Sequence, residues 1–197
     1  MTTLGIVLFE DLEELDAIGP WEVFTSAAAQ RDDFRVLTVA ERSDPVRCAK
    51  GLRVIPDHTF ADVPELDIVL VPGGQGTRRE VENPVLLDFL RRVAPTCSWV
   101  TSVCTGSLLL CGAGLCDGKR VTTHWGFVEP LAKRHPATEV LAGRRYVRDG
   151  RLVTAAGVSA GIDMALWLVG QVFDIETARR TQRFIEYDPA PPYTADV

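Results

Sequence analysis

The sequence predicts an α/β fold of three layers, in which helices cover both faces of a mainly parallel central sheet. Short apolar segments rich in valine, leucine and isoleucine alternate along the chain with longer segments that carry helix start and stop signals. Strands that alternate with helices form a parallel sheet through right-handed crossovers. Polar or glycine-rich loops follow several of these strands, at the edge of the sheet where such proteins bind ligands.

The first half of the chain contains three predicted core strands and two predicted helices. The strands are dominated by aliphatic side chains and cover residues 4–9, 34–40 and 66–71. An acidic loop over 10–19 leads to a helix over 20–29, because proline suits the first turn of a helix. Short strands at 46–48 and 52–55 are expected to form a hairpin or an extension of the sheet edge, and the second helix covers 84–93.

The second half of the chain alternates in the same way. A buried strand at 98–101 leads into a helix over 105–113, and a strand tip at 121–123 leads into a helix near 125–134. Three further short strands cover residues 139–141, 146–148 and 152–154. An apolar helix then reaches about residue 173, a last helix covers 175–185, and the prolines in 188–192 end regular structure. Since no repeat or linker interrupts this order, we expect a single domain over residues 1–197.

The composition excludes several classes of protein. The 197 residues are 46% hydrophobic and 24% charged, as in an ordinary globular protein, and a net charge of −6 does not favour nucleic acid as a partner. The N-terminus lacks the features of a signal peptide, and no apolar stretch reaches the roughly 20 residues that span a membrane. We therefore expect a cytoplasmic protein with no membrane partner. The five cysteines are unevenly spaced and the three histidines lie far apart, so neither disulfides nor a metal site are predicted.

Cys104 lies where a strand turns into a helix with almost no loop between them, within Ser-Val-Cys-Thr-Gly-Ser at 102–107. A side chain at such an elbow stands above the sheet, which predicts that Cys104 is a nucleophile. The bend is expected to strain its backbone, and the start of the helix is expected to favour the thiolate over the thiol. Most free cysteines are instead small buried hydrophobes, and this interpretation applies to Cys48, Cys97, Cys111 and Cys116.

Gly73 and Gly74 directly follow a core strand, where glycine permits a positive φ or a close approach of the backbone. A tight turn alone would explain both residues. Alternatively a backbone N–H, for instance that of Gly74, points into the site. Together with the N–H of Thr105 it would hold a developing anion.

Asp16 and His124 are the candidates for proton transfer. Asp16 follows the first strand and has apolar neighbours, so its side chain is predicted to point inward; capping of the next helix is the alternative. Near Cys104 two anions would be crowded, so one group should keep its proton, and a protonated Asp16 would serve as general acid. His124 lies at another strand end and is a candidate base, although a histidine satisfied within a loop is the commoner case.

The chain resembles the ThiJ/PfpI superfamily, whose members have a flavodoxin-like, class I glutamine amidotransferase-like fold. The resemblance extends over nearly the whole chain and is carried by residues 15–24, 71–74, 101–107, 118–125, 157–163 and 186–192. Within the superfamily these segments are most similar to the branch of isonitrile hydratases. That branch uses a cysteine at the elbow and an aspartate after the first strand, which implies that Cys104 and Asp16 are the catalytic pair. It also has a threonine after the cysteine, as at Thr105, which is thought to influence the orientation of the thiol.

Two other branches of the superfamily match less well. The peptidase-like members carry a histidine directly after the cysteine, where this chain has Thr105. The deglycase-like members use a glutamate where this chain has Asp16. Both differences favour the isonitrile hydratase branch.

The resemblance implies a hydro-lyase that adds water to an isonitrile, R–N≡C, with no metal or organic cofactor. We expect the Cys104 thiolate to attack the terminal carbon and Asp16 to donate a proton, which gives a thioimidate. Asp16 then activates water, Cys104 leaves, and an N-substituted formamide is released. The family is typically dimeric, so we expect a homodimer that acts on a small-molecule substrate. Two alternatives stay open: a glyoxalase or deglycase acting on reactive carbonyls, in which His124 would matter more, and a non-catalytic sensor of a ligand or of oxidation.

Overall fold

A seven-stranded sheet forms the centre of the computed structural model, which describes residues 1–189. The order of its strands is β10-β11-β7-β6-β1-β2-β5, and all neighbours are parallel except β10 and β11. The bounds are β1 Thr2–Leu8, β2 Phe34–Ala40, β5 His58–Thr59, β6 Ile68–Val71, β7 Trp99–Val103, β10 Tyr146–Asp149 and β11 Leu152–Ala155. The mainly parallel sheet of the prediction is confirmed.

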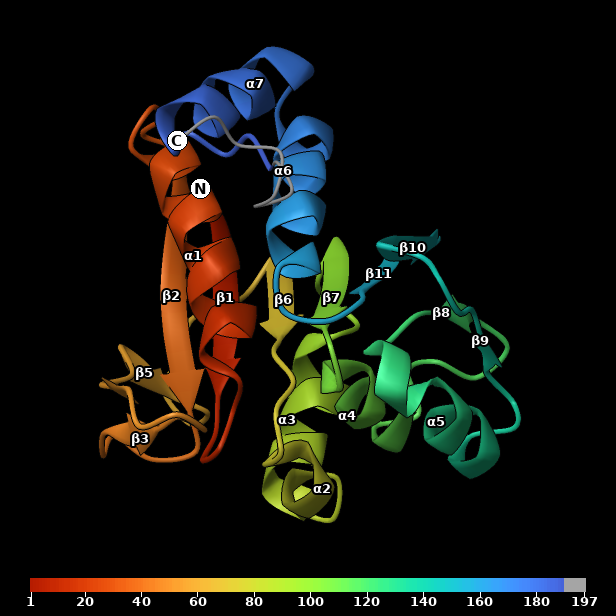
Figure 1. Cartoon of the computed structure of the whole chain (residues 1–197). Coiled ribbons are helices and arrows are strands. Elements are labelled where there is room, and N and C mark those ends of the chain that lie inside the picture. The colour runs from red at the N-terminus through yellow and green to blue at the C-terminus, as the bar shows by residue number, and fades with distance from the viewer. Residues whose placement is uncertain (190–197) are drawn as a thin grey trace.

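Helices pack on both faces of this sheet. One group consists of α1 Glu14–Ala28, α6 Ala160–Val172 and α7 Ile175–Phe184, which pack against one another (Figure 1). The other group consists of α2 Thr77–Glu80, α3 Pro84–Val93, α4 Gly106–Gly112 and α5 Val128–Arg134. With helices on both faces, the central strands β1, β6 and β7 are buried over almost their whole length, as expected for a covered parallel sheet. The three-layer α/β/α architecture is therefore confirmed.

Two small strand pairs lie outside the central sheet. The strands β3 Val46–Arg47 and β4 Arg53–Val54 pair antiparallel, so the hairpin is the correct one of the two expected arrangements. The strands β8 Arg120–Val121 and β9 Glu139–Val140 form a separate parallel pair. A short 3-10 helix, Trp125–Phe127, leads into α5. No helix within residues 1–189 combines the length and the apolar character that a membrane span requires.

The start of α1 differs from the prediction. The helix begins at Glu14, so the acidic loop ends at Glu13 and Pro20 lies inside the helix. Proline is common in the first turn, but it is also tolerated further in when tertiary packing outweighs the lost hydrogen bond. The acidic side chains of Glu14 and Asp16 then lie in the first turn, where the helix dipole favours negative charge.

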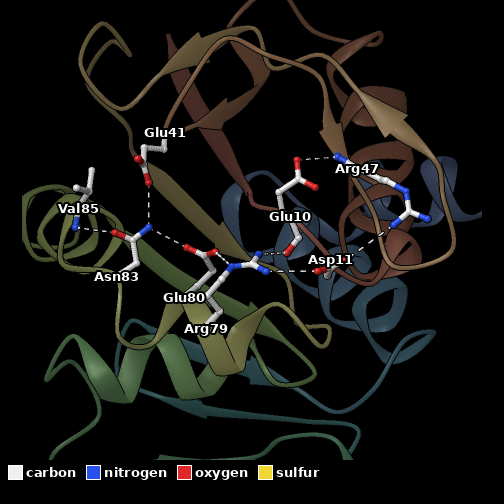
Figure 2. A network of polar contacts seen from close by, with 8 residues as sticks. All are labelled: Glu10, Asp11, Glu41, Arg47, Arg79, Glu80, Asn83 and Val85. Atoms are coloured by element: carbon white, nitrogen blue, oxygen red, sulfur yellow. Dashed lines mark hydrogen bonds and ion pairs between the residues drawn. The ribbon is translucent and has the colours of Figure 1, made fainter.

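Two short elements escaped the sequence analysis. The strand β5 has two residues and the helix α2 has four, and both are too short to show a hydrophobic period. Arg79 makes the tertiary contact that fixes α2 to the loop after β1, because its Nη2 donates to the Glu10 carbonyl at 2.9 Å (Figure 2). Two local contacts of Glu80 accompany it: Arg79 Nε donates to one of its oxygens at 2.9 Å and Asn83 donates to the other at 2.8 Å. The expected end of regular structure at 188–192 lies mostly outside the described residues.

Candidate active site

The elbow at Cys104 is present as predicted. The strand β7 ends at Val103 and α4 begins at Gly106, which leaves only Cys104 and Thr105 between them. Cys104 has a φ of +55°, a strained conformation for a residue with a side chain, and its N–H donates to the Ala156 carbonyl at 2.8 Å. A Cβ atom at Gly106 would overlap the carbonyl oxygen of Val71, so only glycine permits α4 to start this close to β6.

The side chain of Asp16 points inward, as predicted, and is fully buried. Its Oδ2 accepts the N–H of Gly73 at 2.9 Å and its Oδ1 accepts the N–H of Val158 at 3.1 Å. Val158 has a φ of +52°, which is rare for a β-branched residue. Two backbone segments thus hold the carboxyl group in place, and one of them does so in a strained conformation.

The pKa values of Asp16 and Cys104 are both raised. Burial raises the pKa of Asp16 from 3.8 to about 7, against the opposing effect of the Gly73 N–H, and the charge of Glu13 adds to the rise. Burial, together with the negative charge of Asp16, raises the pKa of the Cys104 thiol to about 12. The N–H of Thr105 opposes this rise without cancelling it.

The expectation that the start of α4 favours the thiolate is therefore wrong for the free protein. Desolvation and the neighbouring carboxylate outweigh the few N–H groups at the elbow. The raised pKa values leave the thiol protonated at neutral pH and Asp16 protonated only below about pH 7, so the expected role of a protonated Asp16 as general acid stays a prediction. A thiolate at Cys104 requires that its proton move to a nearby base, and Asp16 is the group whose pKa is coupled to it.

The glycines at the end of β6 make close contacts, but neither offers a free N–H to the site. The N–H of Gly74 donates to Thr105 Oγ1 at 3.0 Å, and the N–H of Gly73 donates to Asp16. The Gly74 N–H is therefore not available to hold an anion, in contrast to the suggested role. A Cβ at Gly73 would lie 2.5 Å from the backbone nitrogen of Thr105, so this glycine is needed for close approach of the two loops. The Thr105 N–H faces the thiol and remains the predicted anion donor.

Arg78 and Thr77 belong to the site and were missed by the sequence analysis. The Thr77 hydroxyl donates to Thr105 Oγ1 at 3.1 Å, and Arg78 Nη1 donates to the Gly74 carbonyl at 2.9 Å and to Thr105 Oγ1 at 3.3 Å. The Arg78 guanidinium also stacks over the ring of Phe127 at 4.6 Å. Both residues lie in α2, and no sequence pattern revealed that this segment turns back onto the elbow.

A pocket of about 170 Å³ opens onto the thiol. It is lined by Glu13, Ala49, Gly74, Gln75, Arg78, Cys104, Thr105, His124 and Val158. His124 thus lies in the site, with its Nδ1 accepting the Gly126 N–H at 3.2 Å and its ring packed against Gly157. Its role as a base stays a prediction.

A second and larger cavity, of about 560 Å³, contains none of the predicted site residues. It lies between the ends of β1 and β2 and the helices α2 and α3. Its main polar side chains bind one another: Arg79 contacts Glu80, and Asn83 contacts both Glu80 and Glu41 (Figure 2). Arg79, Glu80, Asn83 and Glu41 thus satisfy one another in the wall of this cavity.

The four other cysteines are buried, as predicted, and none lines the pocket. Burial raises the pKa of Cys48 to about 11 and that of Cys97 to about 12. Such thiols behave as small apolar side chains. Cys104 differs from them by its place in the pocket and its contact with a carboxyl group.

The chain is thus a mainly parallel α/β sandwich with a strained cysteine at an elbow and a buried acid beside it. The sequence model of the DJ-1/PfpI family matches residues 3–171, and the chain belongs to this family. It is 42% identical to isonitrile hydratase from Pseudomonas putida over 192 residues, which cover 96% of this chain and 80% of that protein.

Two other relatives show the range of the family. The chain is 28% identical to the glutathione-independent glyoxalase DJR-1.2 of Caenorhabditis elegans, over 81% of this chain and 82% of that protein. Among solved structures, a ThiJ/PfpI family protein from Pseudomonas syringae matches with a TM-score of 0.90 and 32% identity, over 100% of this chain and 79% of that chain. The family includes enzymes of different activity, so family membership alone does not select a reaction.

Proposed function

We propose that this protein is an enzyme that hydrates small isonitriles to N-substituted formamides. The observation that carries the proposal is the buried pair of Cys104 and Asp16 at the end of the central strands. The 42% identity to an isonitrile hydratase supports the same reaction. The pocket of about 170 Å³ suits a substrate of a few non-hydrogen atoms, since it has room for roughly five or six waters at about 30 Å³ each.

The first step adds the thiol across the terminal carbon of the isonitrile. Asp16, as a carboxylate, accepts the proton of Cys104 while the sulfur attacks that carbon. Asp16 then returns the proton to the same carbon, which gives the thioimidate R–N=CH–S–Cys104. Because one proton moves from sulfur to oxygen to carbon, the net charge of the buried site does not change during the step.

The second step adds water to the thioimidate. The Asp16 carboxylate takes a proton from water as the water oxygen bonds to the thioimidate carbon, and it passes this proton to the nitrogen. Asp16 then takes the remaining proton of the added hydroxyl while the C–S bond breaks, the formamide R–NH–CHO is released, and Asp16 passes that proton to the departing sulfur. The N–H of Thr105 stabilises the departing sulfur, since it already lowers the pKa of the thiol.

The test measures, by chromatography, how much formamide the protein produces from aliphatic and aromatic isonitriles. We expect turnover by the wild type and loss of at least 1,000-fold in Cys104→Ala and in Asp16→Asn, roughly the scale for removal of a nucleophile or its base. Cys111→Ala is the matched control, because it removes a buried thiol from α4 without touching the pocket. Failure of the reduced, folded wild type to hydrate any isonitrile would refute the proposal, and a fully active Asp16→Asn would refute the role of Asp16.

A glyoxalase is the second candidate, and the similarity to a glutathione-independent glyoxalase supports it. His124 lines the same pocket and would take part in proton transfer on a carbonyl substrate. A methylglyoxal assay run beside the isonitrile assay decides between the two. In the glyoxalase case His124→Gln should lose activity, whereas isonitrile hydration by Cys104 and Asp16 should tolerate this change within about tenfold.

A further inference from the structure

Arg78 is fixed in an unusual way for an exposed arginine. One nitrogen, Nη1, is held by three neutral oxygens: the Gly74 carbonyl, Thr77 Oγ1 and Thr105 Oγ1. One face of the guanidinium lies over the ring of Phe127. The group is therefore oriented before any ligand arrives, and the entropy lost when it binds one is reduced.

The charge of Arg78 is not matched by the protein. No carboxylate among the described residues pairs with it, and its Nε and Nη2 donate to no acceptor in residues 1–189. The next residue, Arg79, is the opposite case, because its nitrogens contact Asp11, Glu80 and the Glu10 carbonyl. Two N–H edges of a fixed arginine fork form the usual recognition element for a carboxylate.

Within residues 1–189, Arg78 is the unpaired cation of the pocket lining. Glu13 also lines the pocket, and it forms an ion pair with Lys50, which pairs with Glu14 as well. Asp16 is fully buried, accepts two backbone N–H groups and does not line the pocket. Among the described lining residues, Arg78 is the only lysine or arginine.

We propose that Arg78 binds a carboxylate on the substrate, and that the enzyme acts on small isonitriles that carry a carboxylate group. The proposal rests on the proposed hydratase function and narrows it to a substrate class. Arg78 shares the pocket of about 170 Å³ with Cys104, so one small molecule can place its carboxylate at the guanidinium and its terminal carbon at the sulfur. Isocyanoacetate, with six non-hydrogen atoms, is the simplest such molecule.

The first experiment compares two substrates of similar shape, isocyanoacetate and isobutyl isocyanide. We expect the ratio of their kcat/KM values to fall roughly 10- to 100-fold in Arg78→Gln, the range for loss of a charge-assisted hydrogen bond. Arg78→Lys should retain part of the preference. Arg183→Gln, the same charge change on α7 at the opposite end of the molecule, should leave the ratio unchanged (Figure 1). Because Arg78 also contacts Thr105, effects common to both substrates are removed by using the ratio.

The second experiment does not depend on isonitrile chemistry. Iodoacetate and iodoacetamide alkylate the same thiol and differ in charge, so their relative rates at Cys104, followed by mass spectrometry, report the preference for an anion. We expect this ratio to fall at least tenfold in Arg78→Gln. If isonitriles are hydrated but neither ratio changes in Arg78→Gln, the assignment of Arg78 is overturned and the proposed function stands. If no isonitrile is hydrated, the function fails, and the alkylation ratio alone decides whether Arg78 selects anions.

Discussion

At the scale of single residues, Cys104 and Asp16 form one titrating unit. Burial raises the pKa of both groups; the charge of Asp16 raises that of Cys104 further, whereas the hydrogen bond from Cys104 lowers that of Asp16. Between about pH 7 and pH 12 the unit holds one proton. A buried thiol with a raised pKa is a poor nucleophile by itself. Its reactivity here depends on a base that ionises near neutral pH, and burial gives Asp16 that property.

The pH dependence of catalysis follows from this unit. Below about pH 7 Asp16 holds a proton and cannot accept that of Cys104; above it the carboxylate can. We therefore expect kcat/KM for isonitrile hydration to rise about tenfold per pH unit below pH 7 and to level off above it. A rate profile from pH 5 to 9 measures this. His124→Gln is the control, because His124 lines the same pocket, and it should keep the same profile. A profile that is flat in the wild type would contradict the role of Asp16 as base.

The same shift predicts how stability changes with pH. Folding raises the pKa of Asp16 from 3.8 to about 7, so the folded state holds a proton that the unfolded state has lost between these values. The contribution of Asp16 is therefore fully present below pH 3.8 and is lost as the pH rises through about 7. Asp16→Asn lacks this dependence.

Urea unfolding of both proteins at pH 5, 6, 7, 8 and 9 tests this expectation. The free energy of unfolding of the wild type, minus that of Asp16→Asn, should fall by about 1.4 kcal/mol per pH unit between pH 5 and 6.5. It should become constant above pH 8. Asp16→Asn also lowers the free energy of unfolding by an amount that does not depend on pH, because an amide cannot accept both the Gly73 and the Val158 N–H. A difference that does not depend on pH would contradict the raised pKa.

At the scale of elements, the site depends on how closely α4 approaches β6. Gly106 begins α4, and its Cα lies against the carbonyl oxygen of Val71. Gly73 in turn lies against the backbone of Thr105. These two contacts between consecutive loops determine where the Cys104 thiol stands relative to Asp16, since Gly73 also donates to that carboxyl group.

Gly106→Ala should therefore disrupt both stability and activity. The added Cβ overlaps a backbone oxygen that cannot move without shifting β6, and we expect a loss of roughly 2–4 kcal/mol in the free energy of unfolding. Gly170→Ala in α6 is the matched control. The added Cβ would lie at an ordinary 3.6 Å from the Cβ of Ala178, so we expect the free energy of unfolding to rise by about 0.5–1 kcal/mol. Thermal and urea unfolding measure both; equal stability of the two variants would contradict the packing described for the elbow.

At the scale of the whole molecule, the sheet topology assembles the site. The strands β11, β7, β6 and β1 are consecutive neighbours, and the segments after their carboxyl ends supply Val158, Cys104, Gly73 and Asp16 in that order. The sequence was sufficient to predict three of these segments, because strand signals and polar or glycine-rich loops are local features. One of these three segments is the elbow at Cys104, which could be predicted because the strand and helix signals nearly meet there.

The rest of the site depends on contacts between distant segments. Pro20 concealed the true start of α1, because its local preference for a first turn was overridden by packing. The position of Arg78 in the pocket could not be predicted, since α2 has four residues and is held by tertiary contacts of Arg79. The direction of the Cys104 pKa shift was missed because desolvation depends on the assembled fold, whereas the helix dipole can be inferred from local sequence.

The last prediction concerns assembly, for which we expect a homodimer. Large apolar side chains are exposed on the single chain, including Trp125 at 83%, Ile55 at 71% and Phe184 at 71%, and a partner would cover only those that lie close together. Light scattering after size-exclusion chromatography should give twice the 21.6 kDa of one chain. Because dimerisation stabilises only the folded state, Tm should also rise with protein concentration, most clearly near the dissociation constant. A mass of 21.6 kDa at tens of micromolar protein, with a Tm that does not change on dilution, would show that these side chains stay exposed in solution.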